Sequence, residues 1–222
     1  GIVDMGAYEY QGTNIYVNAT ATGNNNGSSW ANAYTDLQDA IDAIDANCNG
    51  ADIWVAAGTY LPTKDHTGNS LPTDNRDKNF HLATNMKIYG GFAGTEMQLS
   101  DRVATNITIL SGDFNDDDGG TGSAENAYHV MITANLAAAA VIDGFTIKGG
   151  NADGSGNISY NSGYFYKSGG GGMINYSSSP TITNTTFSYN TADDGGGMYN
   201  SSPIITNTTF SYNTADDGGG MY

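Results

Sequence analysis

Oxygen-bearing side chains are closely spaced in one glycine-rich turn of the sequence. Asp113, Asn115 and Asp117 occupy alternate positions, and Asp118 directly precedes two glycines. Carboxylate and amide oxygens at this spacing, followed by glycine, are typical of loops that bind Ca²⁺. The match to the helix-flanked calcium loop is partial, because position six is Asp118 and position twelve is Ala124. The sequence leaves two interpretations, a calcium site and a solvated acidic turn.

A second set of carboxylates occurs as two pairs, Asp193 with Asp194 and Asp216 with Asp217. If the two segments stack, four carboxylates about 5 Å apart repel one another unless cations or water screen them. One interpretation is a bound divalent ion, and another is an acidic edge that discourages lateral aggregation. A third is an acid/base pair of a glycosidase, although repeated copies of one residue favour a structural role.

Tyrosines and histidines are the other side chains that could bind a ligand or a metal. Five tyrosines are candidates for stacking on sugars or on partner side chains, with packing inside the fold as the alternative. They are Tyr160, Tyr164, Tyr166, Tyr189 and Tyr212. Three histidines, His66, His81 and His129, are far apart without metal-ligand spacing, so we expect packing or surface positions for them.

A sequence repeat must position the second set of carboxylates. Residues 180–199 return as residues 203–222 with one change, since Thr181 becomes Ile204. A period in the twenties is typical of solenoids, in which each repeat forms one coil and contacts its neighbours. Because the last coil has no cap, we expect this end to meet further repeats, a partner or another copy.

Stacking the two copies places each residue over its counterpart at roughly 4.8 Å, the spacing of strands in a sheet. We expect three interior stacks, which pair Ile182 with Ile205, Phe187 with Phe210 and Met198 with Met221. Because Ile182 and Phe187 are five residues apart, strict alternation fails and a bend is needed between them.

Asparagine and glycine supply the bends of each repeat. Stacked Asn184 and Asn207 would form an amide ladder in the first bend. The glycines at 195–197 and 218–220 mark another tight corner. About three bends and three short strands in one repeat predict one turn of a parallel β-helix. The fold class is therefore all-β.

Elements before the repeat include one predicted helix from Thr35 to Asn47. Its apolar residues lie on one face, and Thr35 with Gln38 forms a capping-box pattern. Short strands are predicted at 15–17, 53–55, 86–89, 107–110, 130–133 and 141–147.

The domain organisation follows from these patterns. Residues 1–12 are predicted to be the closing strand of a preceding module or a docking strand between subunits, through Ile2, Val3, Met5, Tyr8 and Tyr10. Residues 13–222 are predicted to form the β-helix, with a cap at 13–60, irregular coils at 61–140 and regular coils at 141–222. An insertion at 154–168 is rich in glycine, serine and tyrosine.

Composition limits the partners of this 222-residue chain. It has 7 Lys and Arg against 23 Asp and Glu, a formal net charge of −16. Such a chain is repelled by nucleic acids and anionic membranes and attracts divalent cations. A single cysteine, Cys48, excludes a disulfide within the chain, and no apolar run is long enough for membrane insertion.

Two recurring patterns carry a resemblance to a known family. They are Phe187-Ser-Tyr-Asn190, repeated at Phe210, and Gly196-Gly-Met-Tyr199, repeated at Gly219. These patterns resemble the repeats of polymorphic outer-membrane proteins and, more widely, secreted bacterial right-handed parallel β-helix proteins of the pectate-lyase-like superfamily. The segments 36–42 and 51–60 are similar to the cap helix and first strand of that superfamily.

The resemblance implies a right-handed parallel β-helix with a short N-terminal capping helix, secreted to the cell surface or outside it. Pectate lyases of this superfamily use Arg or Lys beside acidic Ca²⁺ ligands, whereas the seven basic residues here are scattered along the sequence. The segment 1–10 looks like the closing segment of such proteins, yet it comes first in this chain.

Two functions remain open at this stage. The first is a non-catalytic structural or adhesive solenoid that assembles head-to-tail or forms part of a long surface protein. Assembly would use Asn184, Asn207, Phe187, Phe210, Met221 and Tyr222 together with the segment 1–12. The alternative is a β-helix that binds or cleaves polysaccharides in a groove between segments 61–84, 112–125 and 154–168.

Overall fold

The computed structural model describes residues 14–45, 52–118, 123–136, 140–199 and 202–222. Within these ranges the chain consists of short β-strands, mostly in parallel sheets, and a single α-helix. The predicted docking segment 1–12, with Ile2, Val3, Met5, Tyr8 and Tyr10, lies outside the described residues.

Three parallel sheets contain most of the strands. The first contains, in spatial order, β1 (Ile15–Val17), β2 (Asp52–Ala56), β5 (Lys87–Phe92), β8 (Val141–Asp143), β14 (Thr181–Thr183) and β18 (Ile204–Thr206). The second contains β3 (Gly58–Tyr60), β6 (Thr108–Ser111), β9 (Phe145–Lys148), β15 (Thr186–Ser188) and β19 (Thr209–Ser211). The third contains β4 (Phe80–Leu82), β7 (Met131–Ala134), β13 (Met173–Tyr176) and β17 (Met198–Tyr199).

Smaller elements complete the fold. Strands β10 (Asn151–Ala152) and β16 (Thr191–Ala192) form a parallel pair. Strands β11 (Asn157–Tyr160) and β12 (Gly163–Tyr166) form an antiparallel hairpin, which is the predicted insertion. Two 3₁₀ turns, η1 (Asn75–Asp77) and η2 (Leu99–Asp101), lie in connecting loops.

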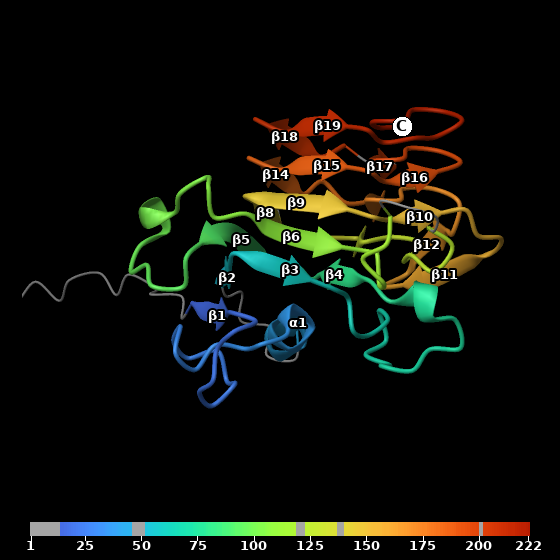
Figure 1. Ribbon diagram of the computed structural model, residues 1–222. Helices are drawn as coiled ribbons and strands as arrows, with labels where there is room; N and C mark the ends of the chain where they lie inside the picture. Colours follow the sequence, from blue (N-terminus) through green and yellow to red (C-terminus); the bar gives the residue numbers. More distant parts are fainter. Residues whose placement is uncertain (1–13, 46–51, 119–122, 137–139, 200–201) are drawn as a thin grey trace, which may run out of the picture.

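Within the repeat, consecutive strands belong to different sheets. Strand β14 lies in the first sheet, β15 in the second and β17 in the third, and β18 returns to the first. Figure 1 shows the resulting layers one above the other, with β18 and β19 at one end. The register confirms the pairing in the three predicted stacks, Ile182 with Ile205, Phe187 with Phe210 and Met198 with Met221. The interior assignment is wrong for the second copy, where Met221 is 49% exposed because no further layer of the described residues covers it.

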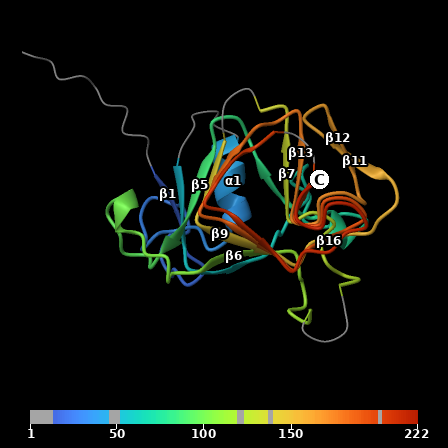
Figure 2. The ribbon, with the colours of Figure 1, turned by 90° about the horizontal axis from the view of Figure 1, so that it is seen from above.

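Inward side chains of the three parallel sheets form one hydrophobic core. Ile182, Phe187 and Met198 are fully buried in it, as the sequence predicted. Figure 2, seen from above, shows the strands around this interior. Burying a side chain of this size stabilises a fold by about 1.5–3 kcal/mol.

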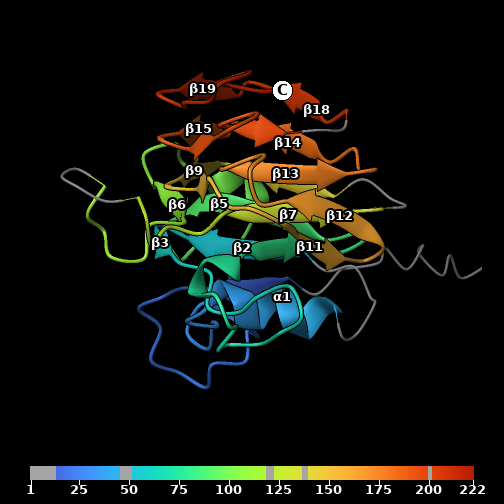
Figure 3. The ribbon, with the colours of Figure 1, turned by 90° about the vertical axis from the view of Figure 1, so that its right-hand side faces the viewer.

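Helix α1 (Leu37–Asp45) covers the end of the core near β1. Figure 3 shows it at the end opposite β18 and β19. Leu37, Ala40, Ile41 and Ile44 are at most 5% exposed, which confirms the predicted apolar face. The two ends of the layered stack therefore differ, because one is covered by a helix.

The predicted capping box is wrong. The backbone N–H of Gln38 donates to Asp36 Oδ1 at 2.8 Å, whereas Thr35 donates its hydroxyl to Asn25 Oδ1 at 3.3 Å. Asp36 directly precedes the first helical residue, so its carboxylate reaches the unpaired N–H groups of the first turn.

The predicted strand at 141–147 is divided into β8 and β9 by Gly144, which has a φ of 85°. Asn184 and Asn207 occupy the same corner in the following layers, with φ angles of 49° and 47°. The bend predicted between Ile182 and Phe187 is thereby confirmed. Asparagine tolerates this left-handed conformation better than most residues, which explains its place here.

Candidate functional site

The acidic turn after β6 gathers three of the predicted metal ligands. Carboxylate oxygens of Asp113, Asp117 and Asp118 lie within 4.8 Å of one another. Asp113 is only 3% exposed, whereas Asp117 and Asp118 face solvent. Asn115 lies exposed in the same turn. Hard cations such as Ca²⁺ take carboxylate oxygens, so the donor set fits such an ion.

Hydrogen bonds hold this acidic turn in place. The backbone N–H groups of Asp117 and Asp118 donate to the Asp113 carboxylate at 3.3 and 3.4 Å. The amide nitrogen of Asn126 donates to both oxygens of Asp118, at 3.1 and 3.0 Å. Gly149 lies against the turn, where an added Cβ would be 2.9 Å from Asp113 Cβ. A larger residue at this position would displace the acidic side chains.

Electrostatics of the turn favour a cation. Burial raises the pKa of Asp118 above its ordinary value of 3.8, and the charges of Asp113 and Asp117 raise it further, while the Asn126 hydrogen bond opposes the shift. Asn126 Oδ1 is buried without a hydrogen-bond partner among the described residues. A divalent ion would relieve the repulsion among the three carboxylates.

The second predicted set of carboxylates does not converge in this way. Asp194 and Asp217 lie side by side in a parallel bridge, and the backbone N–H of Asp216 donates to the Asp193 carbonyl at 2.9 Å. Across the described residues, the acidic turn is the one group of three or more potential metal ligands. Asp193, Asp194, Asp216 and Asp217 therefore stack without forming a comparable cluster.

Basic residues that are scattered in the sequence come together between the loop before β4 and the β11–β12 hairpin. Arg76 lies 4.0 Å from the centre of the Tyr128 ring, and Lys167 lies 4.7 Å from the same centre. Arg76 pairs with Asp153 at 2.6 Å, and Lys167 pairs with Asp77 at 2.5 Å.

This cluster occupies the place where the sequence predicted a polysaccharide groove. The Tyr128 hydroxyl donates to Asp74 at 2.9 Å, and Asn151 donates to the Ser123 carbonyl at 2.8 Å. The Lys167–Asp77 ion pair thus joins segments 154–168 and 61–84, and Asn151 contacts Ser123 of the third segment. Ionic and cation–π contacts of this kind fasten the segments together.

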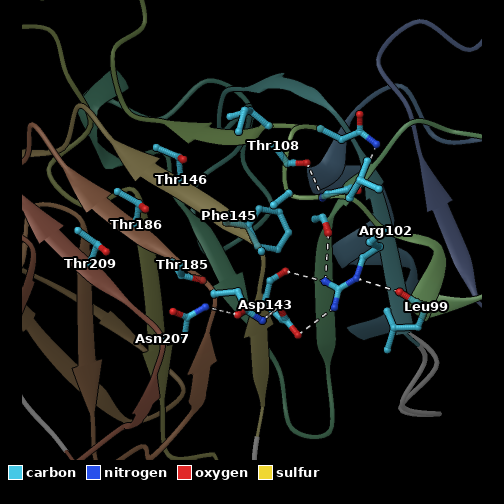
Figure 4. Close-up of a pocket in the computed structure, with 18 of the residues that line it drawn as sticks. Leu99, Arg102, Thr108, Asp143, Phe145, Thr146, Thr185, Thr186, Asn207 and Thr209 are labelled. Carbon is cyan, nitrogen blue, oxygen red and sulfur yellow. Dashed lines mark hydrogen bonds and ion pairs between the residues drawn. The ribbon is translucent and has the colours of Figure 1, made fainter.

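A pocket of about 520 Å³ lies elsewhere, between the loop around η2 and the corner where the first two sheets meet (Figure 4). Arg102 donates to the carbonyls of Leu99 and Gly90, at 3.2 and 3.1 Å, and pairs with the Asp143 carboxylate at 3.2 Å. Thr146, Thr186 and Thr209 also line the pocket. Sequence reasoning missed this site, because Arg102 and Asp143 carry no motif.

The predicted amide ladder starts at Asp143. Asn184 donates its side-chain amide to Asp143 Oδ1 at 2.9 Å, and Asn207 donates to Asn184 Oδ1 at 2.6 Å. Asn184 and Asn207 thus form the predicted ladder, which is anchored on the Arg102–Asp143 ion pair.

A second, interior asparagine ladder was not assigned from sequence. Asn190 is fully buried, and its amide donates to the Ile147 carbonyl and to Asn213 Oδ1, both at 3.0 Å. The signal was available, since Asn190 and Asn213 each follow an inward phenylalanine by three residues. Both asparagines reach inward beyond the end of a strand, where carbonyls need donors.

Large apolar side chains are exposed on the second copy of the repeat. Met221 is 49% exposed and Tyr222 60%, whereas Met198 is fully buried beneath them. The rings of Phe187 and Phe210 stack at 5.0 Å, and those of Tyr189 and Tyr212 also stack at 5.0 Å. The predicted assembly residues among those described therefore lie in ladders that lead to one end of the fold.

The histidines occupy packing positions. His66 and His81 lie 5.8 and 5.3 Å from the Tyr160 ring centre. His129 is buried, with Nδ1 3.1 Å from the Gly170 carbonyl, and burial lowers its pKa to about 4. They belong to no group of three or more potential metal ligands among the described residues.

Among the described residues, no helix has the length and apolar character needed to cross a membrane. Comparisons of the chain with protein-family models, with curated proteins and with solved structures gave no match.

Proposed function

We propose that this chain is a non-catalytic extracellular element of a structural or adhesive surface protein, built as a right-handed parallel β-helix. The supporting observation is the register of the two repeats. Residues 23 apart pair in all three parallel sheets, for example Phe187 with Phe210. Such a fold grows by adding coils, and each coil presents the same surface to the next.

Self-assembly is part of this proposal, because β18 and β19 are edge strands of their sheets within the part of the chain that the structure describes. Exposed edges recruit further strands. Helix α1 covers the opposite end of the core, so head-to-tail contact would require the segment 1–12 to pair with the layer at residues 203–222. This arrangement gives a filament when the rotation between copies does not close a ring.

Electron microscopy of the purified chain tests this assembly. Met221→Lys would place a charge at the exposed end, whereas Met97→Lys changes a side chain that is 87% exposed in a distant loop. We expect regular fibres that Met221→Lys abolishes and Met97→Lys preserves, since burying an unpaired ammonium group is costly. Fibres that survive deletion of residues 1–12 would refute the head-to-tail contact.

We further propose Ca²⁺ as the ion of the acidic turn. Asp113, Asp117 and Asp118 supply its ligands. Burial raises the pKa of Asp118, and the charges of Asp113 and Asp117 add to this shift by a repulsion that a cation would remove. Isothermal titration with Ca²⁺ tests this assignment directly. Heat signals that persist in the triple Asp→Asn variant would place the ion elsewhere.

Polysaccharide binding is the second candidate function, and the pocket beside Arg102 favours it. The pocket combines threonine hydroxyls with the apolar side chains of Val103 and Ile107. Sugar rings present hydroxyls and apolar faces together, so this lining suits them. A glycan array with the intact chain tests it, and binding should fall when Thr186→Val removes a hydroxyl from the pocket.

A further inference from the structure

The interior asparagine ladder shows how one layer is joined to the next. The backbone N–H of Asn190 and its side-chain amide both donate to Asn213 Oδ1, at 3.1 and 3.0 Å. In return, the Asn213 amide donates to the Phe187 carbonyl at 2.9 Å. An asparagine of the upper layer therefore satisfies both a donor and an acceptor of the layer below.

The layer of β18 and β19 presents the same groups, and within the described ranges no residue partners them in this way. Within β19, Thr209 donates its N–H toward the layer below and Ser211 accepts from Tyr189, so Phe210 between them directs its backbone groups to the open side. Among the described residues, no asparagine lies above Asn213 as Asn213 lies above Asn190. A docked layer without an asparagine there would bury these groups unpaired.

The outer ladder has a fixed direction. The Asp143 carboxylate can only accept hydrogen bonds, so the Asn184 amide nitrogen must point toward it. The Asn207 amide nitrogen likewise points down and donates to Asn184 Oδ1. The ladder therefore ends on Asn207 Oδ1, an acceptor that faces the open side. An incoming asparagine can donate to it, whereas an incoming aspartate would be repelled.

We infer that the exposed face of residues 203–222 recognises the sequence of the layer that docks on it. The partner is a parallel coil that carries Asn-Thr-Thr-Phe-Ser-Tyr-Asn, the sequence of 184–190 and 207–213. Residues 180–199 accept this sequence from residues 203–222, and the second copy presents nearly the same face to the next layer. This inference rests on the proposed function, because it specifies which coil the exposed end accepts.

An appended third copy tests the inference in the intact chain. One protein carries an added copy of residues 200–222 fused after Tyr222, and another carries the same added copy with Asn207→Asp and Asn213→Leu, which removes the acceptor of the interior ladder. A control copy carries Thr206→Asp and Thr209→Leu instead, which makes the same kinds of change at exposed positions and keeps both ladders. The measured quantity is hydrogen exchange at the original Asn213 backbone amide.

We expect the unaltered and control copies to slow this exchange at least about tenfold relative to the native chain, and the ladder variant to leave it unchanged. Equal protection by the ladder variant would overturn the sequence recognition while coil docking stands. Rapid exchange beneath the unaltered copy would instead refute coil docking, and with it the proposed function. The two failures are thus distinguishable.

Discussion

The side chain of Asn190 donates to Asn213 Oδ1 at 3.0 Å, across 23 residues of sequence. The contact joins two layers of the fold, and Asn190 is fully buried. It also means that the layer of Asn190 depends on the layer above it for a hydrogen-bond acceptor. This dependence gives a direct way to compare an interior layer with the exposed one.

Replacing the two asparagines should have unequal effects. Asn190→Ala removes bonds to Ile147, Gly150 and Asn213, so we expect a loss of about 3 kcal/mol in the free energy of unfolding. Asn213→Ala leaves fewer buried groups unpaired and should cost about 1 kcal/mol. Urea denaturation measures both. Equal losses would show that the interior position does not make the ladder stronger.

Glycine substitutions should separate steric from conformational effects. Gly195 and Gly156 both have positive φ angles, of 64° and 87°. A Cβ on Gly195 would collide with the Met198 carbonyl oxygen, whereas a Cβ on Gly156 meets nothing within 4 Å. We expect Gly156→Ala to cost about 1 kcal/mol and Gly195→Ala several times more. Thermal unfolding of both variants tests this, and similar melting temperatures would contradict the corner geometry.

Calcium should raise the melting temperature through the acidic turn. Asp117→Asn should reduce this rise, and Asp193→Asn, a matched change on the stacked acidic edge, should preserve it. The linked pH effect follows from the raised pKa of Asp118. The contribution of Asp118 to the free energy of unfolding is complete below 3.8, its ordinary pKa, and is lost as the pH rises through the raised pKa of the folded state. Calcium should therefore raise the melting temperature most at neutral pH. A rise that is the same in both variants would exclude this turn as the site.

His129 should give the opposite pH dependence. Its pKa is lowered from 6.5 to about 4, because burial disfavours the charged ring. As the pH falls, the unfolded state therefore takes up this proton at a higher pH than the folded state does. The free energy of unfolding should drop by about 3 kcal/mol between pH 6.5 and about 4. Denaturation of the native chain and of His129→Gln at several pH values measures the difference. If the unfolding free energy of His129→Gln falls with pH as steeply as that of the native chain, the pH dependence belongs to other groups.

The repeat predicted the local structure well because it reports the same environment twice. Ile182 and Phe187 are inward and separated by a bend, as their five-residue spacing required. The helix face at Leu37, Ala40, Ile41 and Ile44 was also predictable from its period. The helix cap was not, because Thr35 and Asp36 are both acceptable caps in sequence and only a contact from Asn25 distinguishes them.

The sequence by itself determined which residues repeat, which of them face inward and where acidic side chains are dense. Local spacing and residue type carry that information. The tertiary structure alone decided which distant residues meet. Arg102 reaches Asp143, and Arg76 and Lys167 enclose Tyr128, from segments that share no motif. Such contacts depend on how loops of unequal length return to the same side of the stack, and neither period nor composition encodes that path.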